Sequence, residues 1–162
     1  MEEDAVPLQA ASLNLHDLIM NTAEPFTAMA EYQGKELRIQ VEEGLTMTGC
    51  QESIERLISI FCDNAVKYAV DHSVILLSAR SEGRGVLLQI SNEVAVPLTH
   101  EQCNQLFNRF YRAETSRSKG KRGGFGIGLS IAAAIAEKHG GYVRAEMKQD
   151  KRIMFTCRLR NG

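Results

Sequence analysis

The stretch Gly123-Gly124-Phe125-Gly126-Ile127-Gly128-Leu129-Ser130 leads directly into an apolar segment, residues 131–136, that we expect to be helical. Its glycines leave backbone amides uncovered, and a helix that begins here adds unpaired N–H groups and the positive end of its dipole. Helix starts of this kind bind phosphate groups. The preceding residues 112–122 contain one acid, Glu114, and five basic residues: Arg112, Arg117, Lys119, Lys121 and Arg122. Together the two segments predict a polyphosphate ligand, most simply a nucleotide.

The spacing of these glycines excludes two common phosphate-binding loops. It does not fit the Gly-x-Gly-x-x-Gly of a dinucleotide-binding unit, and no Gly-Lys-Ser or Gly-Lys-Thr follows, so the stretch is not a P-loop. A glycine run by itself would equally suit a flexible hinge before a helix. The nucleotide interpretation therefore needs a second motif.

Length and composition predict one soluble domain. The chain has 162 residues, of which 44% are hydrophobic and 24% charged, and its net charge is −1. No general basic field indicates nucleic acid, and no apolar run approaches the ~20 residues of a membrane span, so we expect no direct membrane contact. The four cysteines are scattered, which favours reduced thiols and a cytoplasmic location. We expect residues 1–11 to be a lead-in and residues 12–162 to form the domain.

Hydrophobic periodicity predicts the order of the elements. Helices are expected over 16–32, 52–70, 100–110 and 126–138, and a loop over 91–99. Strands are expected over 13–15, 37–41, 45–48, 73–80, 85–90, 142–149 and 152–160. The sum is a two-layer α/β sandwich: a mixed, mostly antiparallel sheet of about five strands, covered on one face by about three helices.

The second motif is Asp63-Asn64-Ala65-Val66-Lys67-Tyr68, in the helix expected over 52–70. Asn64, Lys67 and Tyr68 are spaced i, i+3 and i+4, so they share one flank of that helix. An amide oxygen is a suitable ligand for Mg²⁺, and an ammonium and a phenol beside it suit a nucleotide. A solvated helix end with a long lysine side chain would show the same trio.

In this order, and about 60 residues apart, the two motifs resemble those of the ATP-binding catalytic domain of sensor histidine kinases. That family belongs to the wider group of ATPases that includes gyrase and Hsp90. Residues 63–68 resemble its N box, Leu106-Phe107-Asn108-Arg109-Phe110-Tyr111-Arg112 its F box, and residues 124–129 its G2 box. The resemblance covers roughly residues 12–160 and implies a Bergerat-type fold that binds ATP and Mg²⁺.

The resemblance also implies a role for each matching residue. Asn64 would coordinate the Mg²⁺ that bridges the phosphates, Lys67 would contact phosphate, and Tyr68 would line the nucleotide site. Arg112 would reach the phosphates or order a lid over residues 113–123. The phosphate loop and the pocket wall would be formed by Gly124, Phe125, Gly126, Ile127, Gly128 and Leu129.

Two positions depart from the family pattern. Where the family has Asp-x-Gly-x-Gly, this chain has Ser91-Asn92-Glu93-Val94-Ala95-Val96-Pro97. Asn92 is the best replacement, because its amide oxygen can still accept from the adenine amino group, and Glu93 is the alternative acceptor. One turn before Asn64, where the family commonly has a polar residue, the chain has Ile60. These departures predict weakened nucleotide binding or an altered base preference, and slow phosphotransfer.

The implied reaction is transfer of the ATP γ-phosphate to a histidine. None of the four histidines in the chain stands in the family's phosphoacceptor pattern, so the acceptor is expected on a dimerisation domain absent from this chain. That domain is the expected direct partner, and a response regulator is the expected indirect one. The parent kinase is expected to be membrane-anchored. The isolated domain is expected to be monomeric. The alternative is a degenerate, non-catalytic signalling module that acts by protein–protein contact, and a third possibility is an anti-sigma-factor serine kinase.

Overall fold

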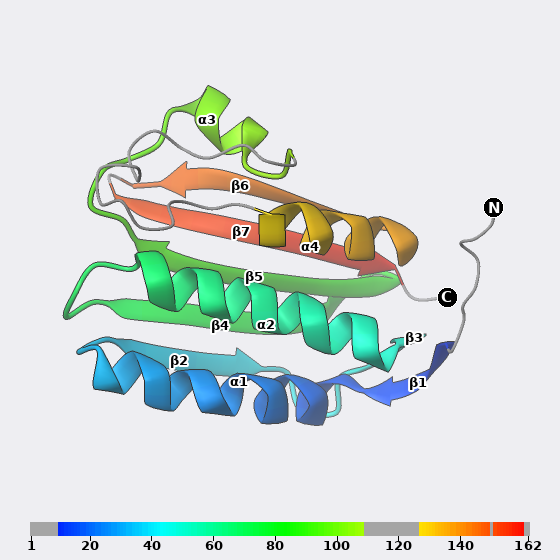
Figure 1. Ribbon diagram of the computed structural model, residues 1–162. Coiled ribbons are helices and arrows are strands. Elements are labelled where there is room, and N and C mark those ends of the chain that lie inside the picture. The colour runs from blue at the N-terminus through cyan, green and yellow to red at the C-terminus, as the bar shows by residue number, and fades with distance from the viewer. Residues whose placement is uncertain (1–9, 109–126, 150, 161–162) are drawn as a thin grey trace.

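Five strands form the main sheet of the computed structural model, which describes residues 10–108, 127–149 and 151–160 (Figure 1). In spatial order they are β2 (Glu36–Val41), β4 (Val74–Glu82), β5 (Gly85–Glu93), β7 (Arg152–Arg160) and β6 (Tyr142–Lys148). β2 runs parallel to β4, and the other neighbours are antiparallel. β1 (Ala10–Asn14) and β3 (Thr46–Cys50) pair separately as a two-stranded sheet. The mixed, mostly antiparallel sheet agrees with the prediction.

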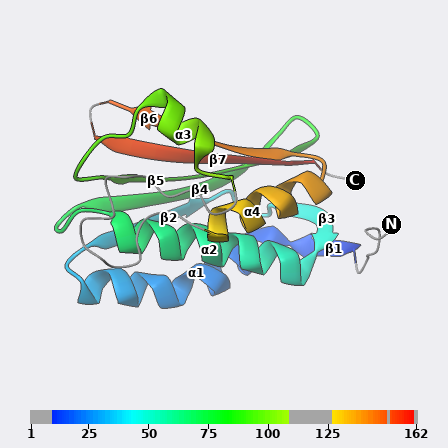
Figure 2. The same ribbon diagram turned by 45° about the horizontal axis from the view of Figure 1, so that its top comes forward.

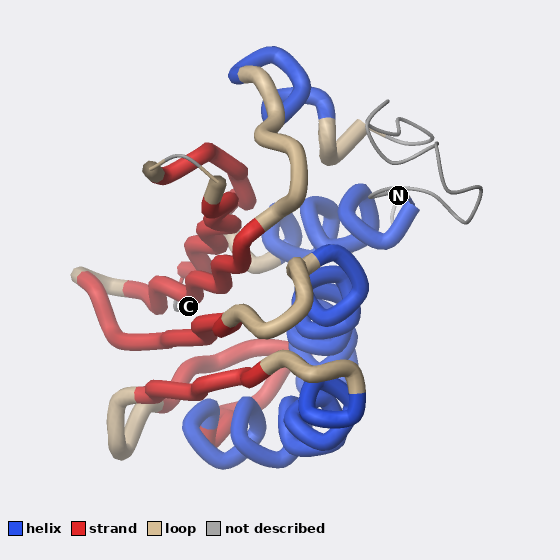
Figure 3. The backbone as a smooth tube through the Cα atoms, turned by 90° about the vertical axis from the view of Figure 1, so that its left-hand side faces the viewer, coloured by secondary structure: helices blue, strands red, loops and turns tan. Residues whose placement is uncertain are grey.

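Helices cover one face of this sheet. Figures 2 and 3 show α1 (Leu15–Tyr32), α2 (Gln51–Tyr68) and α4 (Ile127–Lys138) on the same side of the strands. α1 packs on β2, α2 on β5, and α4 on β6 and β7, while the short α3 (His100–Gln105) lies against β6. The arrangement is the expected two-layer sandwich with three covering helices among the described residues.

The core lies between the two layers and follows from the periodicity of each element. Ile153, Phe155, Cys157 and Leu159 alternate along β7 and are almost fully buried. Phe61 of α2 packs against this row, since its ring centroid lies 6.0 Å from that of Phe155. Fully burying a large apolar side chain contributes about 1.5–3 kcal/mol, so this seam holds α2 firmly on the sheet.

The structure corrects three details of the sequence prediction. Residues 91–93 are not in a loop but complete β5, because Ser91, Asn92 and Glu93 pair with Met154, Ile153 and Arg152 of β7. α3 ends at Gln105 instead of continuing to residue 110. The strand expected over 13–15 lies instead at Ala10–Asn14, because Ala10 and Ala11 pair with the end of β3.

The thiols and the lengths of the helices can be read directly from the structure. The structure gives all four cysteines as free thiols, and Cys62, Cys103 and Cys157 are buried. Within the described residues, no helix combines the length and the apolar character needed to cross a membrane.

Candidate functional site

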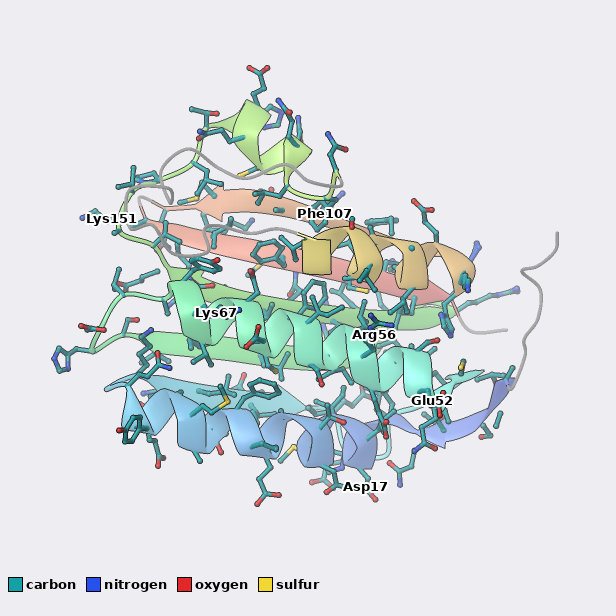
Figure 4. The ribbon with its side chains drawn as sticks, viewed as in Figure 1. Asp17, Glu52, Arg56, Lys67, Phe107 and Lys151 are labelled. Carbon is teal, nitrogen blue, oxygen red and sulfur yellow. The ribbon has the colours of Figure 1, made fainter. Side chains whose placement is uncertain are left out.

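The carboxyl-terminal half of α2 presents the first group of predicted site residues. Asn64 is 9% exposed, Tyr68 is half-buried against the core, and Lys67 is exposed and forms an ion pair with Asp63 at 3.2 Å. Figure 4 shows Lys67 at this end of α2, toward the same end of the sheet as Lys151. An exposed pair one helical turn apart is weak, so the Lys67 ammonium can exchange its partner for another anion.

A shared acceptor joins this end of α2 to the end of β5. The backbone carbonyl of Glu93 accepts a hydrogen bond from the backbone N–H of Val70 at 3.1 Å. The same carbonyl accepts from Nδ2 of Asn92, also at 3.1 Å. Two stretches that are more than twenty residues apart in the sequence therefore meet at one oxygen, which places Asn92 beside the carboxyl end of α2.

Asn92 has an unusual environment. It is 1% exposed and lies on the same face of β5 as the buried Leu88 and Ile90, whereas Glu93 is exposed. Its Nδ2 is occupied by the Glu93 carbonyl, but its Oδ1 is buried without a hydrogen-bond partner in the part of the chain that the structure describes. An unpaired buried acceptor lowers the stability of the folded state by about 1–3 kcal/mol. The Oδ1 atom is therefore a candidate acceptor for a hydrogen bond from a ligand.

The start of α4 approaches α2 at Ile60. Figure 1 shows α4 beginning beside the middle of α2 and running back toward the start of α2. A Cβ added to Gly128 would lie 3.4 Å from Cγ2 of Ile60, so the missing side chain allows close helix packing. Ile60 thus has a packing role at the position where the family pattern is polar. The two predicted motifs come together one helical turn from Asn64.

The remaining predicted residues divide into two groups. Ile127 begins α4, and Leu129 is 1% exposed and belongs to the core. Outside the described residues lie the lid segment 113–123 and four of the predicted site residues: Arg112, Gly124, Phe125 and Gly126.

Two residues near the site were not singled out from the sequence. Lys35 is buried and its Nζ contacts the carbonyl of Val66 in the last turn of α2. Phe107, within the stretch that resembles the F box, packs edge-on against Phe155 with a centroid distance of 6.1 Å. Phe107 could have been found as an apolar anchor, whereas nothing in the local pattern distinguishes Lys35 from a surface lysine.

The donor set suits a metal that is held mainly by a ligand. Over residues 10–108, 127–149 and 151–160, no group of three His, Cys, Asp or Glu side chains could hold an ion. Mg²⁺ commonly uses one or two protein oxygens together with substrate phosphates and water. The amide oxygen of Asn64, next to a helix start that favours phosphate, fits that mode.

Known proteins of similar sequence cover most of the chain. Residues 49–161 match the family described as histidine kinase-, DNA gyrase B-, and HSP90-like ATPase. The chain is 30% identical over 151 residues to Sensor protein DltS of Streptococcus agalactiae, a match that covers 93% of this chain and 38% of that protein. It is 29% identical over 141 residues to Sensor protein VanS of Enterococcus faecium, covering 87% and 36%.

A solved structure has the same fold. The catalytic domain of histidine kinase ThkA superposes with a TM-score of 0.82 at 19% identity, covering 95% of this chain and 97% of that one. The chain therefore spans less than two fifths of these curated relatives and nearly all of this separately solved domain.

Proposed function

Because the chain belongs to the family of histidine kinase-, DNA gyrase B- and HSP90-like ATPases, we propose that it supplies the ATP γ-phosphate in a sensor histidine kinase. The chain is an ATP-binding catalytic domain of the sensor-kinase type, as its resemblance to that family predicted. The acceptor would be a histidine on a dimerisation domain outside these 162 residues. The observation that carries the residue assignments is the buried Oδ1 of Asn92 beside the end of α2, which has no hydrogen-bond partner among the described residues.

Asn92 would recognise the base. Its Nδ2 donates to the Glu93 carbonyl, which fixes the orientation of the amide and leaves Oδ1 as the atom that can accept. An adenine amino group would donate to this oxygen. Guanine has a carbonyl oxygen at the equivalent position, and two acceptors would then face each other. We therefore expect ATP to bind more tightly than GTP.

Asn64, Lys67 and Tyr68 would serve the phosphates and the metal. The amide oxygen of Asn64 would coordinate Mg²⁺, and the Lys67 ammonium would leave Asp63 for a phosphate oxygen. Tyr68, half-buried beside them, would line the site. When bound, Mg²⁺ would supply positive charge that offsets the negative charge of the phosphates. Along α2, the proposed metal ligand therefore comes first, the phosphate contact second and the residue that lines the nucleotide site third.

The start of α4 would hold the far end of the triphosphate. α4 has twelve residues, and the positive end of its dipole favours an anion. Gly124, Phe125, Gly126, Ile127 and Gly128 would form the loop that leads into it, with Arg112 and the lid over residues 113–123 closing on the phosphates. Leu129, buried in the core, would anchor that loop to the sheet.

The chemistry asked of these residues is positioning and charge stabilisation. Phosphoryl transfer needs an in-line acceptor, a metal and a few cations, and little covalent work by the protein. The histidine-bearing domain and, after it, a response regulator would be the partners, in the cytoplasm beside a membrane-anchored sensor. No feature of the described site indicates nucleic acid as a ligand.

Phosphotransfer to a supplied acceptor tests this function. The purified chain would be mixed with the dimerisation domain of its parent kinase and γ-labelled ATP, and label on the acceptor histidine would be measured over time. We expect label that requires both proteins and disappears with Asn64→Ala. ATP binding without any transfer would instead favour the non-catalytic signalling module. The sequence features that suit this alternative are Ile60 and the changed residues 91–97.

A further inference from the structure

Lys35 occupies a place where lysine is rarely found. It lies between α1 and β2 with only 8% of its surface exposed. Its Nζ donates to the backbone carbonyl of Val66 at 2.6 Å and to Oε1 of Gln33 at 3.1 Å. Lysine is almost never fully buried unless it is paired, so we expect the hydrogen bonds of this ammonium to have a structural role.

The structural role of Lys35 follows from the hydrogen bonds at the end of α2. The backbone N–H of Ala69 donates to the carbonyl of Ala65 at 2.9 Å, which is the last regular bond of the helix. The next amide, that of Val70, would normally bond the carbonyl of Val66, but it donates to Glu93 instead. Val66 is 1% exposed, so its carbonyl is out of reach of bulk water and needs another donor. Lys35 is that donor.

The surrounding backbone holds Lys35 in this position. The carbonyl of Gly34 accepts from the N–H of His72 at 2.9 Å, and the N–H of Glu36 donates to the carbonyl of Ser73 at 3.0 Å. The two residues that flank Lys35 are therefore tied to the chain just beyond α2. A cation at the carboxyl end of a helix also interacts favourably with the helix dipole.

Burial and a nearby acid act on the ammonium in opposite directions. Burial lowers the pKa of Lys35 from its ordinary value, and the negative charge of Asp71 raises it. The carbonyl of Val66 and the helix dipole add to the interactions that favour the charged form.

We propose that Lys35 is a positioning residue for the nucleotide site. By bonding the Val66 carbonyl, its ammonium lets the chain leave α2 at Val70 and bind Glu93, the residue that also orients Asn92. It thereby sets the distance between the base contact on β5 and the phosphate flank of α2. The expected effect of Lys35 on nucleotide affinity rests on the proposed function. The expected effect of Lys35 on the Val70 amide does not depend on that function.

The experiment compares Lys35→Met with the wild-type chain by amide hydrogen exchange and by calorimetry. Without nucleotide, we expect the Val70 amide to exchange at least about tenfold faster, because its bond to Glu93 loses support. Amides of Ile90 and Phe155, which lie in the centre of the sheet, should keep their exchange rates. ATP affinity should fall about tenfold. The ratio of affinities with and without Mg²⁺ should stay constant, because Asn64 precedes the disturbed turn.

Control variants separate positioning from general stability. Lys148→Met removes an equal charge from an exposed lysine on β6 and should change neither readout. Lys35→Arg keeps a cationic donor and should restore part of the affinity. Lys35→Leu also removes the donor, and it carries the same test if Lys35→Met does not fold.

The outcomes are distinct. Unchanged Val70 exchange in Lys35→Met and Lys35→Leu would overturn the proposal, and so would faster exchange spread equally over Ile90 and Phe155. If the wild-type chain binds no nucleotide, the proposed function fails, while the Val70 readout still decides the role of Lys35.

Discussion

Replacing Asn92 with leucine should make the nucleotide-free domain more stable and its nucleotide binding weaker. The side chains have similar size, and the substitution removes a buried oxygen that has no partner among the described residues. Removing that unpaired acceptor is worth about 1–3 kcal/mol. The substitution also loses the Nδ2 bond to Glu93, worth about 0.5–1.5 kcal/mol, but the Glu93 carbonyl keeps its bond from Val70. The net expectation is a gain of about 1 kcal/mol.

The effect on ligand has the opposite sign. Without Oδ1, the adenine amino group would be buried with no acceptor, which costs about 1–2 kcal/mol, or about 5–30-fold in affinity. A gain of about 1 kcal/mol corresponds to a rise of about 2–4 °C in Tm for a domain of this size. Differential scanning calorimetry of the nucleotide-free protein measures the first effect, and titration calorimetry with ATP measures the second.

The two results must be read together. A loss of stability with unchanged ATP affinity would refute the reasoning, because Asn92 would then be a structural residue whose oxygen has a partner outside the described segments. As a matched control, Gln89→Leu replaces an amide on β5 that bonds Thr156, on the opposite face of the strand. It should leave ATP affinity unchanged.

Three further predictions concern the metal, the start of α4 and the thiols. Asn64→Ala should weaken Mg²⁺–ATP by about tenfold or more and metal-free ATP much less, whereas equal losses in calorimetry would remove Asn64 as the metal ligand. Gly126→Ala combined with Gly128→Ala should abolish nucleotide binding. Gly128→Ala alone should fold and bind, since among the described residues its Cβ would meet Ile60 at 3.4 Å, an ordinary contact. Loss of binding in that single variant would place its Cβ in the phosphate path. Hydrogen bonds from Ser53 lower the pKa of Cys50, whereas burial raises the pKa of Cys62 and of Cys157 to about 12. More thiolate at neutral pH should make Cys50 react first with iodoacetamide in peptide mapping, and equal rates for Cys62 would contradict this order.

Most of the fold follows from local patterns. The strict alternation in β7 and the helical spacing of Ile54, Leu57, Ile58 and Phe61 predicted which faces are buried, and the structure confirms them. The end of β5 was mispredicted because Ser91, Asn92 and Glu93 have a polar, loop-like composition. Their pairing with β7 is a contact across about sixty residues of sequence, and no local pattern carries it.

Some features of the candidate site could likewise be predicted from local sequence, and others could not. The shared flank of Asn64, Lys67 and Tyr68 could be read from helical spacing, since it depends on one element alone. Two features could not be read this way: the Asn92 oxygen that lacks a partner within the described segments, and the bond from Lys35 to Val66. Each depends on where a second element lies. The packing of Ile60 against Gly128 explains a residue that the sequence showed only as a departure from the family pattern.

The most direct test of the central claim is a calorimetric titration of the purified chain with ATP and with GTP, each with and without Mg²⁺. The account predicts one site, tighter binding of ATP than of GTP, and an affinity for ATP that rises with Mg²⁺. No binding up to millimolar nucleotide would contradict the nucleotide site at the junction of α2, β5 and α4. Equal binding of ATP and GTP would contradict the role given to Asn92.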